Sequence, residues 1–377
     1  MRLLDRYLLR ELLAPLGYCL SGFLLIWISA DLSNNLHDFQ EKRLGAADIA
    51  NYYRVITPEF LITVLPIALL LALLYTLTNH ARHNEITAIR AAGISLWRLC
   101  LPYLGVGLAA SLLLLVVNEF WVPDSADKAE QIRNRHIASP GGAEPGRGQV
   151  RNLGFSNDSE QRQWLIGLYN TLTAEMSHPK VKMKQPDGSW LWLESDHAAR
   201  SNGVWTFTGH VTLHRESGRP DEPLVPLLQT NLMAMPQFSE TPEQIASEIK
   251  ISSALSPGRG ARRADIPIVD LLNYLRLHPD LDAKKKPWLY TKLQGRLAAP
   301  WTCLVVVLIA IPFGAASGRR NAFVGVASSI VICFAFFVVQ TLALMFGASG
   351  NLPSWLAAWS PNVSFGIAGV WLTARVK

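Results

Sequence analysis

The sequence predicts an α-helical polytopic membrane protein, with six transmembrane helices in two groups of three and an inserted β-jellyroll or β-sandwich domain. Three observations predict it: long stretches without a charged residue, a polar middle that divides them, and alternating apolar residues within that middle. A helix needs about 20 apolar residues to cross roughly 30 Å of hydrocarbon. Buried helices of soluble proteins usually run shorter and carry a polar stripe, so these stretches favour a membrane.

Six stretches are long enough to span a bilayer. Four of them contain no Asp, Glu, Lys or Arg and cover residues 12–30, 60–79, 99–118 and 297–318. Residues 321–374 also lack these charges and suffice for two passes, with a break at the Gly- and Pro-containing residues 347–353. Pro58 and Pro66, at the start of the second stretch and inside it, predict a kink, because proline frees a backbone carbonyl.

The Lys and Arg residues of the short segments predict the orientation, because these residues are enriched in cytoplasmic loops. They gather at both ends of the chain and in the loops after the second and fourth spans, at Arg2, Arg6, Arg10, Arg82, Arg90, Arg98, Arg319, Arg320, Arg375 and Lys377. The segment after the first span has Lys42, Arg43 and Arg54, and the segment after the fifth has none. Both termini are therefore predicted to be cytoplasmic and the middle domain to lie outside the cytoplasm.

The composition of the chain predicts three parts. They are residues 1–122 with the first three spans, 123–265 as the β-domain, and 266–377 with a connecting helix and the last three spans. Within the middle part, alternating apolar residues predict short strands at residues 164–169, 181–184, 190–193 and 204–214. Strands this close together, separated by turn signals, favour a jellyroll or sandwich. Helices are predicted at residues 242–249 and 268–277.

The sequence lacks the motifs of several enzyme classes. It has no phosphate-binding loop of the G-x-x-x-x-G-K-[ST] type, no H-E-x-x-H zinc motif and no G-x-S-x-G nucleophile elbow. No cofactor is expected in this chain. His80 and His83 could in principle share a metal, but no surrounding Cys or carboxylate pattern supports this. Without its own nucleotide site the protein must take energy from a partner or act as a scaffold.

Charge and cysteine content exclude further classes. The net charge is +6, but the basic residues are dispersed or placed at helix ends, so nucleic-acid binding is not predicted. The cysteines all fall inside predicted spans, at Cys19, Cys100, Cys303 and Cys333. A disulfide framework is therefore not expected. The first apolar run has no small-x-small cleavage site and is interpreted as a retained span rather than a signal peptide.

The loop between the second and third spans reads Asn84-Glu-Ile-Thr-Ala-Ile-Arg-Ala-Ala-Gly-Ile-Ser95. This segment is similar to the coupling-helix pattern of the LptF/LptG family, the permease subunits of the lipopolysaccharide-export ABC transporter. Further matching motifs are Leu4-Asp-Arg-Tyr7, Thr241-Pro-Glu243, Arg296-Leu-Ala-Ala-Pro300 and Pro361-Asn362. The resemblance covers essentially the whole chain. The first of these motifs and the run from Leu352 to Asn362 favour the G-like form.

The resemblance implies a coupling helix at about residues 80–93. Glu85 would meet a basic side chain of the ATPase, and Gly93 would let the helix end turn tightly beneath that subunit. The other residues assigned to this coupling site are Arg82, Ile86 and Ile89. From the sequence alone, Glu85 could instead pair with Arg82 or with Arg90 on a solvated helix.

In this family, basic residues at the outer end of the first span contact the phosphorylated head of lipopolysaccharide. Lys42 and Arg43 are the nearest candidates in this sequence. They could equally be ordinary interface anchors, because the sequence departs from the family pattern just before them, at Asp31, Asn34 and Asn35.

The function that the resemblance implies is that of a permease subunit, not an enzyme, in the bacterial inner membrane. It would extract lipopolysaccharide and pass it to a periplasmic β-jellyroll bridge. Its expected partners are a cytoplasmic ABC ATPase dimer, which binds ATP and Mg²⁺, a paralogous permease, the bridge protein and the lipid. An alternative is a non-transporting envelope scaffold or signalling protein. A mechanotransmission-type ABC subunit is disfavoured, because such subunits generally have four spans.

Overall fold

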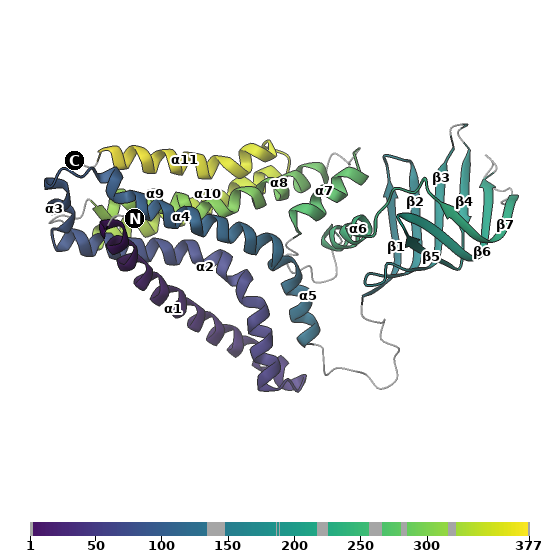
Figure 1. Ribbon diagram of the computed structural model, residues 1–377, viewed down its shortest axis with the longest axis horizontal. Helices are drawn as coiled ribbons and strands as arrows, with labels where there is room; N and C mark the ends of the chain where they lie inside the picture. Colours follow the sequence, from purple (N-terminus) through teal and green to yellow (C-terminus); the bar gives the residue numbers. More distant parts are fainter. Residues whose placement is uncertain are drawn as a thin grey trace. The chain divides into compact units, whose positions relative to one another are not determined.

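The computed structural model divides into two compact units. One contains residues Met1–Ile137 and Ala283–Lys377, and the other contains Ala138–Asp282. Figure 1 shows long helices in the first unit and a β-sheet with the helices α6 and α7 in the second. The structure describes residues 3–133, 148–185, 187, 189–216, 225–255, 266–279, 285–315 and 322–375.

The helical unit contains most of the helices of the chain. They are α1 (Leu3–Glu41), α2 (Ala46–Arg82), α3 (Glu85–Ala91), α4 (Leu96–Phe120), α5 (Val122–Arg133), α8 (Lys285–Ala298), the 3₁₀ turn η1 (Ala299–Trp301), α9 (Thr302–Ala315), α10 (Ala322–Ala348) and α11 (Ser354–Arg375). The unit boundaries differ from those predicted at residues 123 and 265. The reason is that α5 packs against α2, while α6 (Pro242–Leu255) packs against α7 (Ile268–Leu277) in the other unit.

Five helical segments of the described chain are long and apolar enough to cross a membrane. They are α1, α2, α4, the run Lys285–Gly314 and the segment Ile330–Ala348 of α10. The sixth predicted span corresponds to α11, which has no charged residue before Arg375. Its Trp, Ser, Pro and Asn residues lower its average hydropathy. The polytopic helical class with an inserted antiparallel β-domain is confirmed.

Prolines shape two of these spans. The fourth span was predicted to start at residue 297, but the helix already begins at Lys285 and changes to a 3₁₀ turn at Pro300. Proline has no N–H to donate within a helix, so the backbone tightens locally. Pro58 and Pro66 both lie inside α2. This helix bends along its length in Figure 1, as expected for a helix that contains prolines.

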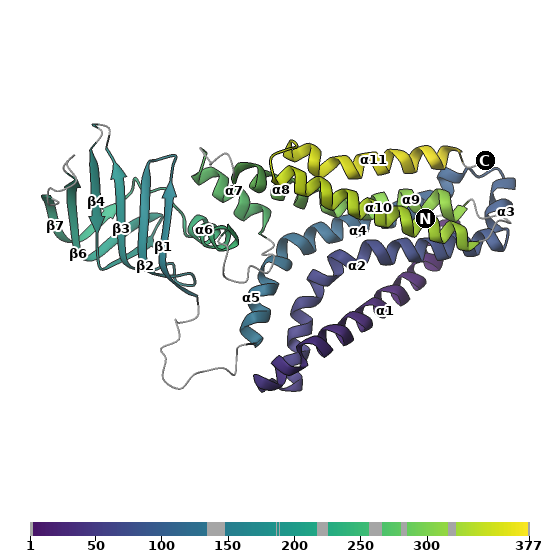
Figure 2. The same cartoon turned by 180° about the vertical axis from the view of Figure 1, so that it is seen from behind.

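The core of the helical unit lies around α2 and α9. Helix α2 contacts α1, α4, α5 and α9, and α9 in turn contacts α10 and α11. Close packing requires small residues at some crossings. At Gly369 in α11, an added Cβ would lie 2.8 Å from the backbone of Leu308 in α9. Figure 2 shows these helices from behind.

The second unit contains a seven-stranded antiparallel sheet. Its strands are β1 (Gln149–Asn157), β2 (Arg162–Asn170), β3 (Met176–Lys184), β4 (Trp190–Glu194), β5 (His197–Ser201), β6 (Val204–Glu216) and β7 (Val225–Met235). Both β4 and β5 pair with β3 on one side and with β6 on the other. They therefore occupy one position in the sheet, and the strands follow one another in sequence order. The strands β1, β5 and β7 were not predicted.

The strands share a line of irregular residues that crosses the sheet. The paired register skips Asn152 in β1, Gly167 in β2 and His178 in β3. On the same line, His178 N donates to the carbonyl of Asp196 at 2.8 Å, between β4 and β5. In β6 the register shifts at Gly209, whose φ is +92°. The register of β1–β3 is the same on both sides of these residues, so only the shift between β6 and β7 is a bulge, which bends the strand and increases its twist. We call this line through Gly209 the crease of the sheet.

One face of the sheet carries the core of the second unit. Its fully buried aromatic side chains include Trp164, Trp205, Phe207 and Phe238. Trp164 contacts the other three rings, with centroid separations of 5.9, 6.2 and 5.4 Å respectively. The alternation that predicted β2 and β6 from sequence therefore reflects one buried and one solvated face.

Candidate functional site

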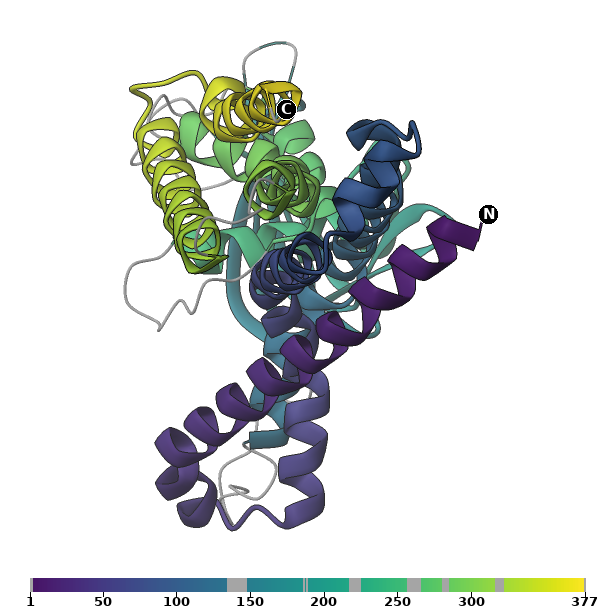
Figure 3. The same ribbon diagram turned by 90° about the vertical axis from the view of Figure 1, so that its left-hand side faces the viewer.

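The predicted coupling segment forms a short helix between two spans. Helix α2 ends at Arg82, and Asn84, with φ +57°, turns the chain into α3. After α3, Gly93 has φ +84°, and the Ser95 hydroxyl accepts a hydrogen bond from Arg98 N and begins α4. A Cβ at Gly93 would meet no atom within 4 Å, so the backbone conformation alone favours glycine there. Figure 3 views this end of the helical unit.

Glu85, at the start of α3, bonds to two other helices. Its Oε2 lies 2.7 Å from His80 Nδ1 in α2 and accepts a hydrogen bond of 3.1 Å from the Tyr7 hydroxyl in α1. The His80 side chain is 3% exposed and that of Glu85 is 33% exposed. The sequence left open that Glu85 pairs with Arg82 or Arg90. The described chain shows neither pair, because His80 and Tyr7 hold the carboxylate.

A second polar contact lies beside the first. Arg98 in α4 forms an ion pair with Asp5 in α1: Nη2 donates a hydrogen bond to Oδ2 at 3.0 Å, and Nη1 lies 2.9 Å from Oδ1. These side chains are 33% and 14% exposed, respectively. The pair joins α1 to α4 by a charge-assisted hydrogen bond, which is stronger than one between neutral groups. It was not predicted, because 93 residues separate the partners.

The remaining predicted coupling residues divide between the bundle and solvent. Ile86 is 5% exposed and belongs to the core of the helical unit, and Ile89 packs against that core. Arg82 and Gly93 are exposed. Helix α3 therefore rests on the bundle through its isoleucines. The exposed side chains of α3 are those of Thr87, Ala88, Arg90 and Ala91, and all of these except Arg90 are small.

The structure does not bring Lys42 and Arg43 near this cluster. They form the turn between α1 and α2, where Arg43 has φ +52°. At 1.5 Å per residue, Lys42 lies roughly 18 Å along the helix beyond residue 30, where the predicted hydrocarbon stretch ends. Asp31, which departs from the family pattern, accepts a hydrogen bond of 3.1 Å from the Tyr53 hydroxyl. Asp31 therefore joins α1 to α2 through this hydrogen bond.

Two groups of residues offer metal-ligating atoms. His80 bonds to Glu85, and His83 Nδ1 lies 2.9 Å from the Asn79 carbonyl oxygen, so each histidine has its own protein partner. In the last turn of α1, His37, Asp38 and Glu41 have ligand atoms within 4.8 Å of one another. All three are exposed, and exposed groups of this kind are common without an ion. The geometry supports no metal role for either group.

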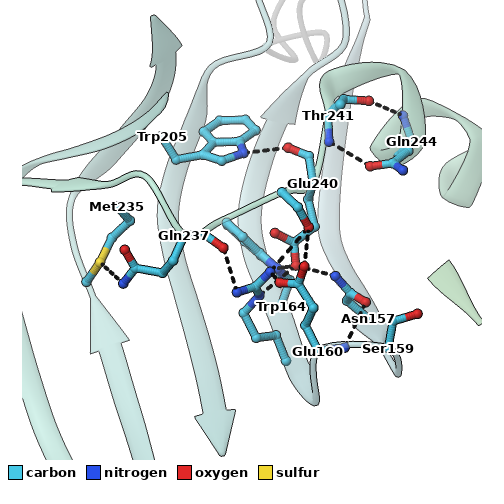
Figure 4. A network of polar contacts seen from close by, with 12 residues as sticks. Asn157, Ser159, Glu160, Trp164, Trp205, Met235, Gln237, Glu240, Thr241 and Gln244 are labelled. Carbon is cyan, nitrogen blue, oxygen red and sulfur yellow. Dashed lines mark hydrogen bonds and ion pairs between the residues drawn. The ribbon is translucent and has the colours of Figure 1, made fainter. Parts of the chain in front are cut away.

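A buried carboxylate in the β-unit was missed from the sequence. Glu240 is fully buried, and its Oε1 accepts bonds from Asn157 Nδ2 at 2.9 Å, Arg162 Nε at 2.9 Å and Trp164 Nε1 at 3.2 Å (Figure 4). Its backbone carbonyl accepts a bond of 2.7 Å from Trp205 Nε1. The network ties the segment after β7 to β1, β2 and β6.

The Thr241-Pro-Glu243 motif directly follows this network. Thr241 N donates to Gln244 Oε1 at 2.8 Å, and Gln244 N donates to the Thr241 hydroxyl at 3.2 Å. This reciprocal capping box fixes the start of α6. The motif therefore has a structural role here, which is to begin a helix at the edge of the buried network.

A second buried cluster joins α6 and α7 to the sheet. His278 Nδ1 lies 2.8 Å from Asp158 Oδ2, and Nε2 lies 3.0 Å from Glu248 Oε2. Burial by itself lowers the pKa of His278, but the hydrogen bonds to Glu248 and Asp158 and their charges raise it, so that the pKa lies above its ordinary value. The sequence gives no signal for this cluster, because 120 residues separate His278 from Asp158.

Fold and site together define the class of a multi-pass membrane protein with a β-domain inserted between its third and fourth spans and a short helix between its second and third. The sequence matches the family described as "Lipopolysaccharide export system permease LptF/LptG" over residues 6–375. The chain therefore belongs to the LptF/LptG family.

Relatives with assigned names agree with this membership. The chain is 22% identical to "Lipopolysaccharide export system permease protein LptF" of Escherichia coli (strain K12) over 368 residues, which is 96% of this chain and 91% of the relative. It matches the protein of the same name from Shigella flexneri with the same identity and coverage. The predicted resemblance is confirmed at the level of the family. The preference for the G-like form stays a prediction, since the family description covers both forms and these relatives carry the F name.

Proposed function

We propose that this protein is a permease subunit of an ABC transporter in the bacterial inner membrane, extracting lipopolysaccharide and passing it to a periplasmic bridge. The observation that carries the proposal is the family match over residues 6–375. The architecture supports it, because the chain offers separate parts for crossing the membrane, for meeting a cytoplasmic partner and for acting outside the cytoplasm.

The orientation follows from the basic residues of the helical unit. Helix α3 and both chain termini lie at one end of that unit (Figure 1). The same end carries Arg82, Arg90, Arg98 and Arg375, which favours the cytoplasm. The α1–α2 turn and the β-unit are then periplasmic.

Helix α3 is the proposed contact for a cytoplasmic ABC ATPase dimer. The hydrogen bonds of Glu85 to Tyr7 and His80 both involve Oε2. Within the described chain, Oε1 has no hydrogen bond. That oxygen can accept a bond from a basic side chain of the ATPase. The small exposed side chains of α3 allow a partner to approach the helix closely.

The spans provide apolar surface for lipid and for a paralogous permease. In α1 and in the candidate span of α10, 11% and 17% of the residues are buried, against 61% in α2. Exposed apolar side chains on these outer helices include Leu25, Ile26, Phe334 and Met345. Such surface favours acyl chains and partner helices, since burying it yields roughly 25 cal/mol per Å².

The β7 strand is the proposed contact with the bridge. In the described sheet β7 pairs with β6, and it contains no charged residue. Its exposed side chains include Leu227, Leu228 and Leu232, the last of these 63% exposed. Natural edge strands usually carry charges that prevent pairing with another chain. An uncharged apolar edge therefore suits addition of a strand from a β-rich partner.

The proposal is tested by replacing Glu85 with Ala or Lys in the complete transporter, reconstituted in proteoliposomes. We expect association of the ATPase to weaken by at least about tenfold, because a charged partner is left without its carboxylate. Release of lipopolysaccharide per ATP hydrolysed should also fall. Glu41→Ala is the matched control, since Glu41 is exposed at the far end of α1. Unchanged ATPase association and lipid release in Glu85→Ala would contradict the proposal.

A further inference from the structure

Helix α1 has no direct covalent connection to the coupling helix: the chain joins it only to α2, at the opposite end of α2 from α3. The chain joins α3 directly to α2 through Asn84 and to α4 through Gly93, so movement of α3 reaches those spans through the backbone. The first turns of α1 lie far along the chain from the α1–α2 turn, so they receive such movement through contacts with neighbouring helices. The two polar contacts that reach its first turns are therefore of interest.

These contacts join α1 to the elements on both sides of Gly93. The Tyr7 hydroxyl donates to Glu85 Oε2 at 3.1 Å, which connects α1 to α3 across 78 residues of sequence. Asp5 pairs with Arg98 at 2.9 and 3.0 Å, which connects α1 to α4. The partners lie two residues apart on α1, so a single stretch of the helix carries both links.

The cluster is built so that Glu85 has a fixed orientation. His80 is 3% exposed, lies 2.7 Å from the Glu85 carboxylate, and its ring centroid is 5.7 Å from that of Tyr7. His80 thus fixes the carboxylate from the buried side while Tyr7 approaches from α1. Tyr7 is 41% exposed, so this bond lies at the surface, where it can break and re-form as α3 moves.

The first turns of α1 contain most of its buried side chains and therefore do most to fix the position of the helix. In its candidate span 11% of residues are buried, fewer than in any of the other four. Its fully packed side chains are Leu8, Leu12 and Leu16 near the start and Phe39 near the end. Outward side chains such as Tyr18 are largely exposed. Between these residues, half-buried side chains such as Phe23 and Trp27 also pack against the unit, so α1 is held most firmly near its two ends.

We propose that Tyr7 and the Asp5–Arg98 pair are positioning residues that transmit movement of the coupling helix to α1. This inference rests on the proposed function, because it takes α3 as the element that the ATPase moves. Glu85 then connects the ATPase, through Oε1, with α1, through the Tyr7 hydroxyl at Oε2, while His80 also bonds to Oε2. Transport would depend on the second contact even when the ATPase is fully bound.

The test uses the complete transporter in proteoliposomes and measures two quantities: ATPase association, and lipopolysaccharide released per ATP hydrolysed. For Tyr7→Phe we expect unchanged association and a fall of about fivefold in release per ATP, the size of a typical coupling effect. Tyr18→Phe is the matched control, because it removes a hydroxyl from the same helix where 77% of the residue is exposed. It should leave both quantities unchanged.

The ion pair allows a rescue experiment, in which ATPase association should stay unchanged in every variant, as a folding defect would not allow. Asp5→Arg and Arg98→Asp should each lower release per ATP, and the double variant should restore it. If Tyr7→Phe releases lipid as efficiently as the unaltered protein, the inference is wrong. It is also wrong if Tyr7→Phe loses ATPase association in proportion to release, since that indicates a folding defect.

The outcome for Glu85 separates this inference from the proposed function. If Glu85→Ala leaves association and release intact, the proposed function fails. If Glu85→Ala uncouples the transporter while Tyr7→Phe and both ion-pair variants do not, only the transmission through α1 is rejected.

Discussion

Two glutamates, Glu85 in the helical unit and Glu240 in the β-unit, show how the same side chain serves different purposes. Glu240 is fully buried, and one oxygen accepts bonds from three side chains of β1 and β2. Glu85 is 33% exposed and contacts Tyr7 and His80, which lie on two different helices. In both carboxylates the hydrogen bonds of the described chain fall on one oxygen, but the Glu240 side chain is fully buried whereas that of Glu85 is partly exposed.

The difference follows from burial and from the number of donors. Removing one member of a buried charged network leaves the other groups desolvated and unpaired, which is costly. Contacts at the surface are screened by water and contribute little to stability. A group at the surface can therefore exchange partners during a cycle, whereas a buried network like that of Glu240 holds one arrangement.

The largest expected effect is that of Glu240→Ala. It should lower the free energy of unfolding of the β-unit by about 3–5 kcal/mol, because Arg162 and two further donors lose their acceptor. Limited proteolysis of the full chain across a temperature series measures this. Glu194→Ala is the control, since its pair with Lys180 is partly exposed and should contribute at most about 1 kcal/mol. If both variants lose the same free energy of unfolding, the buried hydrogen bonds of Glu240 do not stabilise the β-unit more than an exposed ion pair does.

A smaller effect is expected at the crease of the β-sheet. At Gly209, with φ +92°, an added Cβ would lie 2.5 Å from Asp196 Oδ2. Gly209→Val should therefore destabilise the β-unit by about 1–3 kcal/mol. Gly154→Val provides the comparison, because the nearest atom to a Cβ there is 3.6 Å away. If both variants unfold at the same temperature, the crease does not depend on the missing Cβ.

The His278 cluster predicts a pH dependence of the β-unit. The pKa of His278 is raised above its ordinary value in the folded state. Its contribution to stability is then fully present below the unfolded-state pKa of about 6.5 and is lost as pH rises through the folded-state pKa. Thermal unfolding between pH 6 and pH 9 should show this loss. In His278→Gln the loss of stability with rising pH should be smaller. If the pH profile of that variant is identical to that of the unaltered protein, His278 is not the cause of the pH dependence.

The smallest stability effect is expected for Glu85→Gln. It should change the free energy of unfolding of the full chain by less than about 1 kcal/mol, because its contacts are partly exposed. Thermal unfolding in detergent measures this beside Glu240→Gln. A loss as large as that of Glu240→Gln would place Glu85 among the buried structural groups. The contrast between the two glutamates would then disappear.

Much of the helical unit could be predicted from the sequence. The spans follow from uncharged stretches, since a bilayer imposes a length and a composition on each helix. Helix boundaries were less accurate: α8 begins at Lys285, where the sequence is still basic and gives no apolar signal. In the β-unit, alternation predicted β2 and β6, but β7 has no alternation, because Pro226–Gln229 are all exposed.

The candidate site was predictable in position but not in its contacts. The motif at Asn84–Ser95 placed Glu85 and Gly93 on a short helix between spans, and Gly93 occupies the left-handed turn that glycine allows. The partners of Glu85 could not be predicted. Tyr7 is 78 residues away, and nothing in a one-dimensional pattern states which side chains meet across packed helices.

The sequence by itself determined the spans, the inserted β-domain and the family, because each depends on local composition or on short motifs. The tertiary structure alone decided that Glu85 bonds to Tyr7 and His80, that Arg98 pairs with Asp5, and that Glu240 is enclosed by donors from β1 and β2. These contacts depend on distances between segments far apart in the chain. Packing sets such distances, and with them it sets the burial that separates the exposed carboxylate from the enclosed one.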